Sequence, residues 1–172
     1  MTEEPGPVEA LDADAFVALV RQFDLSHRRL AFRLLGGRDR LDDVLQDAYA
    51  RAFRALPGFR GRSSLETWLY RIVYNACLDE LRRAGRRKEV PLEEWRESGA
   101  DRTTAVEQRL DLATALVALP VELRAAVLLV DAEELSYEEA AEILGVPEGT
   151  LASRLNRARL ALRATLQEGI AR

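Results

Sequence analysis

The sequence predicts an all-α protein with two small helical domains joined by an acidic linker. Apolar residues recur at helical spacing, no segment alternates as a half-buried strand would, and periodicity is lost over residues 89–104. The length of 172 residues suits one domain or two small ones. We therefore predict a first domain over residues 12–88, a linker over 89–104 and a second domain over 105–172.

The first two helices of the first domain have clear ends. Residues 12–35 are helix-prone, and the two glycines at 36–37 favour a C-cap and a turn. The second helix presents one wide apolar face over residues 44–56. The Pro-Gly pair at 57–58 ends it, because proline and glycine both break helices.

A third helix follows a short loop. Ser63 or Ser64 can cap it, and Glu66 lies in its first turn, where a negative charge is favourable. Its apolar stripe includes Trp68, for which a core position is favoured over a contact with nucleic acid. Cys77 adjoins the stripe and is expected to be a buried thiol. Together the three helices form a small bundle.

The second domain carries the clearest local signal. Helical pattern resumes near Thr104 and is interrupted at Pro120. Residues 136–139 form a capping box, in which a serine and a glutamate each bind the other's backbone N–H. Residues 145–147 form a tight turn, and a long helix follows from about 148 to 167. A short helix, a glycine turn and a second helix are typical of a helix-turn-helix unit.

Composition argues against an enzyme and against a membrane protein. His27 and Cys77 are the only histidine and cysteine, too few for a zinc site of these ligands. There is no glycine-rich phosphate loop or nucleophile elbow, and no apolar run reaches the roughly 18–20 residues needed to cross a bilayer. We expect no catalytic or metal site, no cofactor, no membrane insertion and a cytoplasmic location. His27 is expected to be an ordinary surface or cap residue.

Basic charge is concentrated in one block. The chain has a net charge of −4, yet residues 51–88 carry a net charge of +7 between acidic neighbours. Local charge decides where a polyanion docks, so this block predicts contact with nucleic acid. Phe59, Tyr70 and Tyr74 lie among its arginines, a mixture that suits the unstacked bases of a single strand. Asn75 can hydrogen-bond the edge of an extruded base.

The long helix of the second domain would enter a major groove. Ser153, Asn156 and Arg157 face outward on it, and asparagine and arginine suit adenine and guanine edges. Contacts to the DNA backbone are expected from arginines on the same helix, namely Arg154, Arg159 and Arg163.

A third surface is acidic. The exposed face of the second helix carries Asp42, Asp43, Gln46 and Asp47. An acidic face suggests a basic protein partner, since it would repel phosphates. The same charges also complement the positive end of the helix dipole, and the sequence leaves both interpretations open.

Both halves carry motifs in a recognisable order. The first half contains Asp43-Val-Leu-Gln-Asp-Ala-Tyr, Arg51-Ala-Phe-Arg-Ala-Leu, Phe59-Arg-Gly and Ser64-Leu-Glu-Thr-Trp-Leu-Tyr-Arg-Ile. The second half contains Leu135-Ser-Tyr-Glu-Glu-Ala-Ala-Glu-Ile-Leu-Gly-Val-Pro and Ser153-Arg-Leu-Asn-Arg-Ala-Arg. Through these motifs the chain resembles, over nearly its whole length, the extracytoplasmic-function (ECF) sigma factors of bacterial RNA polymerase.

The resemblance implies a role for each surface. The acidic face would bind the clamp helices of the polymerase's largest subunit. The melted −10 element would be held by Phe59, Arg60, Arg62, Ser63, Asn75, Arg82 and Arg86. The −35 duplex would be read by Thr150, Ser153, Arg154, Asn156, Arg157 and Arg159. The implied partners are core RNA polymerase, promoter DNA and an anti-sigma factor, and no covalent step is involved.

Two other interpretations remain open at this point. A different helix-turn-helix regulator would bind duplex DNA without polymerase, but it leaves the features of residues 59–87 unexplained. A helical scaffold with no role on nucleic acid would leave the arginines as solvated surface. Ala152 stands where many relatives carry Arg or Lys, Asn156 is at a variable base-reading position, and Glu148 adds negative charge near the groove. The −35 sequence is therefore not predicted.

Overall fold

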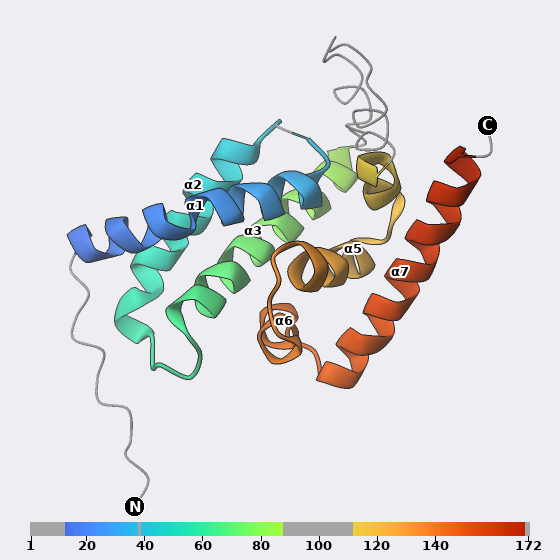
Figure 1. Cartoon of the computed structure of the whole chain (residues 1–172). Helices are drawn as coiled ribbons and strands as arrows, with labels where there is room; N and C mark the ends of the chain where they lie inside the picture. Colours follow the sequence, from blue (N-terminus) through green and yellow to red (C-terminus); the bar gives the residue numbers. More distant parts are fainter. Residues whose placement is uncertain (1–12, 38, 88–111, 171–172) are drawn as a thin grey trace, which may run out of the picture.

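The computed structural model describes residues 13–37, 39–87 and 112–170, and all regular elements in these ranges are helical (Figure 1). The first half contains α1 (Ala13–Leu35), α2 (Leu41–Ala55), the short 3-10 turn η1 (Leu56–Gly58) and α3 (Leu65–Arg87). The second half contains a helix over 112–118, α5 (Val121–Val127), the π-helical turn η3 (Leu128–Ala132), α6 (Tyr137–Leu144) and α7 (Glu148–Ile170). The all-α prediction is confirmed, whereas the predicted acidic linker lies outside the described residues.

Local capping explains where two of these helices begin. Ser64, rather than Ser63, caps α3, because its Oγ accepts a hydrogen bond from the backbone N–H of Thr67 at 3.0 Å. The capping box of α6 is confirmed, with Ser136 Oγ accepting from the Glu139 N–H at 3.2 Å and the Glu139 carboxylate accepting from the Ser136 N–H at 2.9 Å. Gly145 ends α6 in the left-handed region, at φ 66°.

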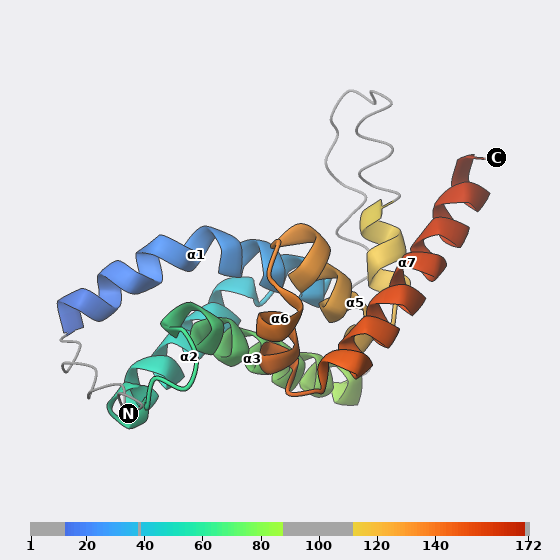
Figure 2. The same ribbon diagram turned by 60° about the horizontal axis from the view of Figure 1, so that its bottom comes forward.

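The two halves share one hydrophobic core. α6 packs on α3, while α5 and η3 contact α1, as Figures 1 and 2 both show. Buried side chains of this core include Leu30 and Val73 from the first half and Leu129 and Ile143 from the second. Each half therefore buries apolar surface against the other, and in this structure the two predicted domains form one packed unit.

α3 is buried on two sides, which the sequence did not indicate. Tyr70 and Tyr74 are 2% and 4% exposed, contrary to the prediction that they lie at a base-stacking surface. Both belong to the core that the two halves share, and so does Cys77. Cys77 is fully buried as predicted, and burial raises the pKa of its thiol to about 12.

Arg124 joins the two halves by hydrogen bonds from inside the protein. Its Nη1 donates to the carbonyl of Leu34 at 2.6 Å, and its Nη2 donates to the carbonyls of Val117 and Leu119 at 2.5 and 3.0 Å. Leu34 and Val117 lie in the last turns of α1 and of the helix over 112–118, where carbonyls have no partner within the helix, and Leu119 directly follows the second of these helices. A single guanidinium therefore satisfies three carbonyls that would otherwise need partners.

Glu133 makes a second polar link between the halves. Its side chain is 2% exposed and faces α1, with Arg29 Nη2 at 3.4 Å and Arg33 Nη1 at 3.9 Å from its carboxylate oxygens. The hydroxyl of Tyr70 donates to the same carboxylate at 3.5 Å. A buried carboxylate depends on such partners, because an unpaired charge is costly to bury.

The prediction that His27 is a surface or cap residue is wrong. His27 is fully buried, its Nδ1 lies 3.1 Å from the hydroxyl of Tyr49, and its ring forms a T-shaped contact with the ring of Tyr70. Burial lowers the pKa of His27 to about 4, against a smaller opposing influence from Asp24.

This buried histidine makes stability depend on pH. Between pH 6.5 and about 4, His27 takes up a proton in the unfolded chain but not in the folded one, so the free energy of unfolding falls as pH falls. We expect His27 to contribute up to about 3 kcal/mol to this loss. Urea denaturation of the wild type and of His27→Asn at several pH values measures it. Asparagine does not titrate, so the free energy of unfolding should depend less on pH in His27→Asn than in the wild type. The same dependence on pH in both proteins would contradict the prediction.

Candidate nucleic-acid interface

The loop before α3 presents an aromatic pair. The N–H of Phe59 binds the carbonyl of Leu56 at 3.0 Å, which closes η1, and Gly61 turns the chain at φ 66°, a conformation that favours glycine. The half-buried rings of Phe59 and Trp68 pack at 5.2 Å between centroids. Trp68 also packs against the core, in agreement with its predicted position there. Three further predicted site residues lie in this loop. Arg60 and Arg62 are exposed, and Ser63 is half-buried.

One exposed face of α3 continues from this aromatic pair. Trp68, Arg71, Asn75 and Arg82 follow one another at intervals of three, four and seven residues, so they share one side of the helix. Arg71, Asn75 and Arg82 are all exposed. Seven residues of helix separate Trp68 from Asn75, a rise of about 10 Å. Arg86 lies in the last turn of α3, but its side chain is outside the described part of the structure.

The arginines at this face are partly held by acidic neighbours. Asp79 accepts from Arg51 at 2.8 Å and from Arg82 at 3.4 Å. The hydrogen bond from Arg51 is the main cause that lowers the pKa of Asp79. Arg82 is thereby oriented while 68% of its side chain stays exposed, so it remains free to contact a phosphate.

The outward face of α7 is the one that the sequence predicted. Leu151 and Leu155 are buried and fix the rotation of the helix, which leaves Ser153, Asn156 and Arg157 exposed. Thr150 is half-buried. The helix therefore presents a polar stripe over its first three turns, as a groove-reading helix requires.

Two of the predicted residues of α7, Arg159 and Ser153, already have hydrogen-bond partners within the chain. Arg159 makes a bidentate ion pair with Asp131, at 2.6 and 3.0 Å, which ties α7 to η3. Ser153 Oγ donates to the carbonyl of Thr150 at 2.9 Å and keeps its acceptor capacity. Arg154 is half-buried, and its positive charge opposes part of the rise that burial causes in the pKa of Tyr74 on α3. To contact a DNA phosphate, Arg159 would have to leave the carboxylate of Asp131 and bind the phosphate instead.

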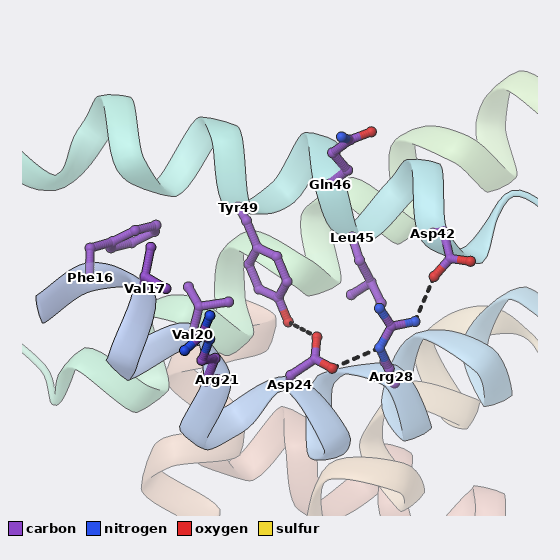
Figure 3. A pocket seen from close by; sticks show the side chains of 10 residues that line it. All are labelled: Phe16, Val17, Val20, Arg21, Asp24, Arg28, Asp42, Leu45, Gln46 and Tyr49. Atoms are coloured by element: carbon purple, nitrogen blue, oxygen red, sulfur yellow. Dashed lines mark hydrogen bonds and ion pairs between the residues drawn. The ribbon is translucent and has the colours of Figure 1, made fainter. Parts of the chain in front are cut away.

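The acidic face of α2 is paired with arginines of the same chain. Figure 3 shows the pocket between α1 and α2, where Asp42 binds Arg28 at 2.6 Å and Arg28 in turn binds Asp24 at 2.7 Å. The hydroxyl of Tyr49 donates to Asp24 at 3.2 Å and closes the network. Asp42 nevertheless stays 84% exposed, and Gln46 points away from the pocket.

The other two aspartates of the acidic face, Asp43 and Asp47, are also paired with arginines of the same chain. Asp43 lies 3.5 Å from Arg40, and Asp47 lies 2.6 Å from Arg51. Sequence reasoning missed these arginines, although Asp47 and Arg51 stand at the i,i+4 spacing that predicts such a pair. A basic partner that docks on this face therefore competes with arginines that are already present.

The side chains on these surfaces are suited to binding. Among the residues that the structure describes, no three or more histidine, cysteine, aspartate or glutamate side chains are placed to hold a metal ion. Nor is any described helix long and apolar enough to cross a membrane. The exposed groups are arginine, asparagine, serine and aromatic side chains, which bind phosphates, base edges and base faces. Recognition of nucleic acid is the chemistry that they support.

Two family models match the chain, one in each half. The model described as Sigma-70 region 2 matches residues 14–87, which include the loop, α3 and the acidic face of α2. The model described as Sigma-70, region 4 matches residues 109–162, which include α6 and the outward face of α7. The matched ranges thus contain every surface described above.

Curated relatives are similar over most of the chain. The chain is 44% identical over 151 residues to the ECF RNA polymerase sigma factor SigM of Mycobacterium tuberculosis, covering 88% of this chain and 76% of that protein. It is 35% identical over 179 residues to the ECF RNA polymerase sigma-E factor of Escherichia coli K12, covering 96% and 93%.

Two solved structures share the overall arrangement. The sigma factor RpoE of Bartonella quintana, in complex with the anti-sigma factor NepR, matches with a TM-score of 0.72 and 27% identity, over 90% of this chain and 98% of that one. CnrH in complex with the cytosolic domain of CnrY matches with a TM-score of 0.69 and 28% identity, over 91% and 90%.

Proposed function

The chain belongs to the ECF sigma factors of RNA polymerase, and on this basis we propose that it directs promoter recognition and melting through three surfaces. The acidic face of α2 docks on core polymerase, the outward face of α7 reads the −35 duplex, and the loop before α3 together with α3 holds a melted −10 strand. The sigma factor lends specificity, while polymerase carries out the covalent chemistry.

At the −10 element, the aromatic pair and the exposed face of α3 act together. An extruded base stacks against the Phe59–Trp68 pair, and the amide of Asn75 binds a base edge. Arg82 and Arg86 bind the phosphates that follow along the strand. Capturing bases in this way offsets an unpairing cost of a few kcal/mol. The observation that carries the proposal is the exposure of Asn75 and Arg82 on the same side of α3 as Trp68.

At the −35 element, α7 reads the major groove. Asn156 suits an adenine edge and Arg157 suits a guanine edge, since both can bind these bases through two hydrogen bonds. Thr150, Ser153, Arg154 and Arg159 contact the DNA backbone and set the register of the helix on the duplex. Ala152 is too short to reach a base edge, so discrimination falls mainly on Asn156 and Arg157.

Core polymerase is the partner for the acidic face. Asp42, Asp43, Gln46 and Asp47 bind basic side chains of the clamp helices on the largest subunit. One of the similar solved structures is a sigma factor in complex with an anti-sigma factor, and the other is also a complex of two proteins. An anti-sigma factor is therefore the second protein partner that we propose.

Retention by immobilised core polymerase tests this function. We expect the chain to be retained, and we expect charge reversal at Asp42 and Asp47 to weaken retention. Charge reversal at Glu134, which is exposed in the second half, is the matched control and leaves retention unchanged. No retention of the wild-type chain would overturn the proposed function.

Replacing Arg157 with alanine tests the reading of the −35 element. We expect the substitution to cost roughly 1–3 kcal/mol of discrimination against a changed base, because a bidentate contact is lost. Competition binding of holoenzyme to a set of −35 variants measures this preference. Arg163→Ala serves as the control. Arg163 is exposed and is expected to bind only phosphate, so its loss should weaken binding to all −35 variants equally. An unchanged preference in Arg157→Ala would remove this residue from base reading.

A further inference from the structure

Arg28 of α1 reaches across to the acidic face of α2, which the proposed function assigns to core polymerase. We propose that Arg28 is an internal competitor, which masks Asp42 in the free chain and must release it before a basic side chain of polymerase binds there. The inference rests on the proposed function, because it concerns how tightly and how selectively that face binds its partner.

The guanidinium of Arg28 binds two carboxylates through two different nitrogens. Its Nη1 donates to Asp42 on α2 at 2.6 Å, and its Nε donates to Asp24 on α1 at 2.7 Å, as Figure 3 shows. The hydrogen bond to Asp42 and then the one to Asp24 are the main causes that raise the pKa of Arg28 above its ordinary value. Arg28 therefore remains a cation that joins the two helices.

These two contacts can be broken one at a time. Asp24 stands four residues before Arg28 on α1, a spacing that lets the pair form within one helix, and it also accepts from the hydroxyl of Tyr49 at 3.2 Å. When Arg28 releases Asp42, its Nε keeps Asp24 as a partner, so its charge is not left unpaired. The exchange then breaks a single exposed ion pair, and pairs of this kind contribute little to stability.

Space for an incoming side chain lies beside the ion pair. Arg28 and Asp42 line two neighbouring hollows between α1 and α2, one of about 550 Å³ and one of about 350 Å³. Cavities of roughly 300–1,000 Å³ hold drug-sized ligands, so either hollow has room for one basic side chain. Because 84% of the Asp42 side chain is exposed, a partner can reach this carboxylate while Arg28 is still bound to it.

The other two arginines of the acidic face have structural partners on α3. Arg51 pairs with Asp79 at 2.8 Å, and Arg40 lies 3.6 Å from the buried carboxylate of Glu80. Both arginines therefore help to attach α2 to α3 in addition to pairing with aspartates of the acidic face. Release of Asp42 by Arg28 leaves these links between α2 and α3 intact, which makes Arg28 the arginine suited to exchange.

Masking by Arg28 makes the acidic face more selective. A protein that docks on Asp42 has to replace a guanidinium that is already at hydrogen-bond distance. Specificity increases when weak partners are disfavoured in this way, because only a partner with a strongly basic, well-placed side chain replaces the internal one. Affinity for polymerase is accordingly lower than the aspartates alone would give.

Arg28→Gln tests the competition, with Arg21→Gln as the matched control. We expect Arg28→Gln to bind core polymerase about threefold to fivefold more tightly than the wild type, because Asp42 loses its internal partner. Arg21 is exposed on the same helix, lines the same hollow and forms no ion pair with a described residue. Its replacement removes the same charge from α1 without unmasking Asp42. Since 43% of the Arg28 side chain is exposed, its replacement should leave the fold unchanged.

Fluorescence anisotropy of the labelled full chain, titrated with core polymerase, measures these affinities. The gain in Arg28→Gln should shrink as the salt concentration rises, because salt screens the exposed charges that compete. A gain no larger than that of Arg21→Gln would overturn the competition, and so would a gain that does not change with salt or a loss of affinity.

Asp42→Asn tests whether Arg28 acts through Asp42. In the Asp42→Asn background, Arg28→Gln should bring no gain beyond that of Arg21→Gln, because no charge is left to unmask. A full gain in that background would overturn the masking of Asp42. If the wild-type chain does not bind core polymerase, the proposed function is overturned and the competition with it. If the wild type binds and Arg28→Gln behaves like Arg21→Gln, only the competition is overturned.

Discussion

Arg124→Ala is expected to lower the free energy of unfolding by about 3–5 kcal/mol, the largest stability effect predicted for this chain. Arg124 is 7% exposed, and its guanidinium donates to the carbonyls of Leu34, Val117 and Leu119. Alanine fills none of the vacated space and leaves these acceptors without their donor. Each unsatisfied buried group costs about 1–3 kcal/mol, so the losses accumulate.

Urea denaturation followed by circular dichroism measures this effect. Arg124→Lys should give an intermediate loss, because one ammonium cannot reach three acceptors in the geometry of a planar guanidinium. Arg21→Ala, at an exposed position of α1, is the control and should change stability by less than about 0.5 kcal/mol. A loss below about 1 kcal/mol for Arg124→Ala would show that these three hydrogen bonds do not stabilise the fold.

Asn75→Ala should reduce promoter opening by about tenfold or more while leaving polymerase binding intact. Asn75 is exposed, so its replacement should leave the fold unchanged. The loss is confined to the step in which a base leaves the duplex, because the amide binds that base only once it is extruded. A bidentate contact to a base edge contributes about 1–3 kcal/mol, which sets the size of the effect.

Fluorescence of 2-aminopurine placed in the −10 element follows this step directly. Asn156→Ala is a matched control, since it removes the only other asparagine and should weaken duplex binding rather than opening. A template that is already unpaired at −10 should restore much of the activity of Asn75→Ala. Equal losses of polymerase binding and of opening in Asn75→Ala would refute the capture of a flipped base.

Structural features that depend only on residues close together in the sequence could be predicted from it. The capping box of α6 involves only Ser136 and Glu139, three residues apart, and the structure contains it as predicted. The outward face of α7 followed from the spacing of Leu151 and Leu155 alone. In both cases the information lies within a few turns of one helix.

Features created by contacts between residues far apart in the sequence could not be predicted in this way. His27, Tyr70 and Tyr74 are polar or amphipathic side chains whose burial depends on residues far away in the sequence. Arg124 stands in an apolar run, yet the carbonyl of Leu34 that it binds is 90 positions earlier. The π-helical turn at Leu128–Ala132 likewise interrupts a run that periodicity predicts to be continuous helix.

In the candidate site, too, some features follow from helical spacing and others depend on the tertiary structure. The shared face of Asn75 and Arg82 follows from helical spacing, and so does the pairing of Asp47 with Arg51. The pairing of Asp42 with Arg28 joins α1 to α2 and needs the tertiary structure. The acidic face is consequently less available to a basic partner than the sequence indicates.

Run-off transcription with purified core polymerase, on fragments of genomic DNA from the same organism, shows whether this chain directs initiation at promoters. We expect specific transcripts that appear only when this chain is added, from fragments that share a −35 and a −10 element. The same pattern of transcripts with core polymerase alone, or none with the chain present, would contradict the claim that this chain supplies promoter recognition and melting.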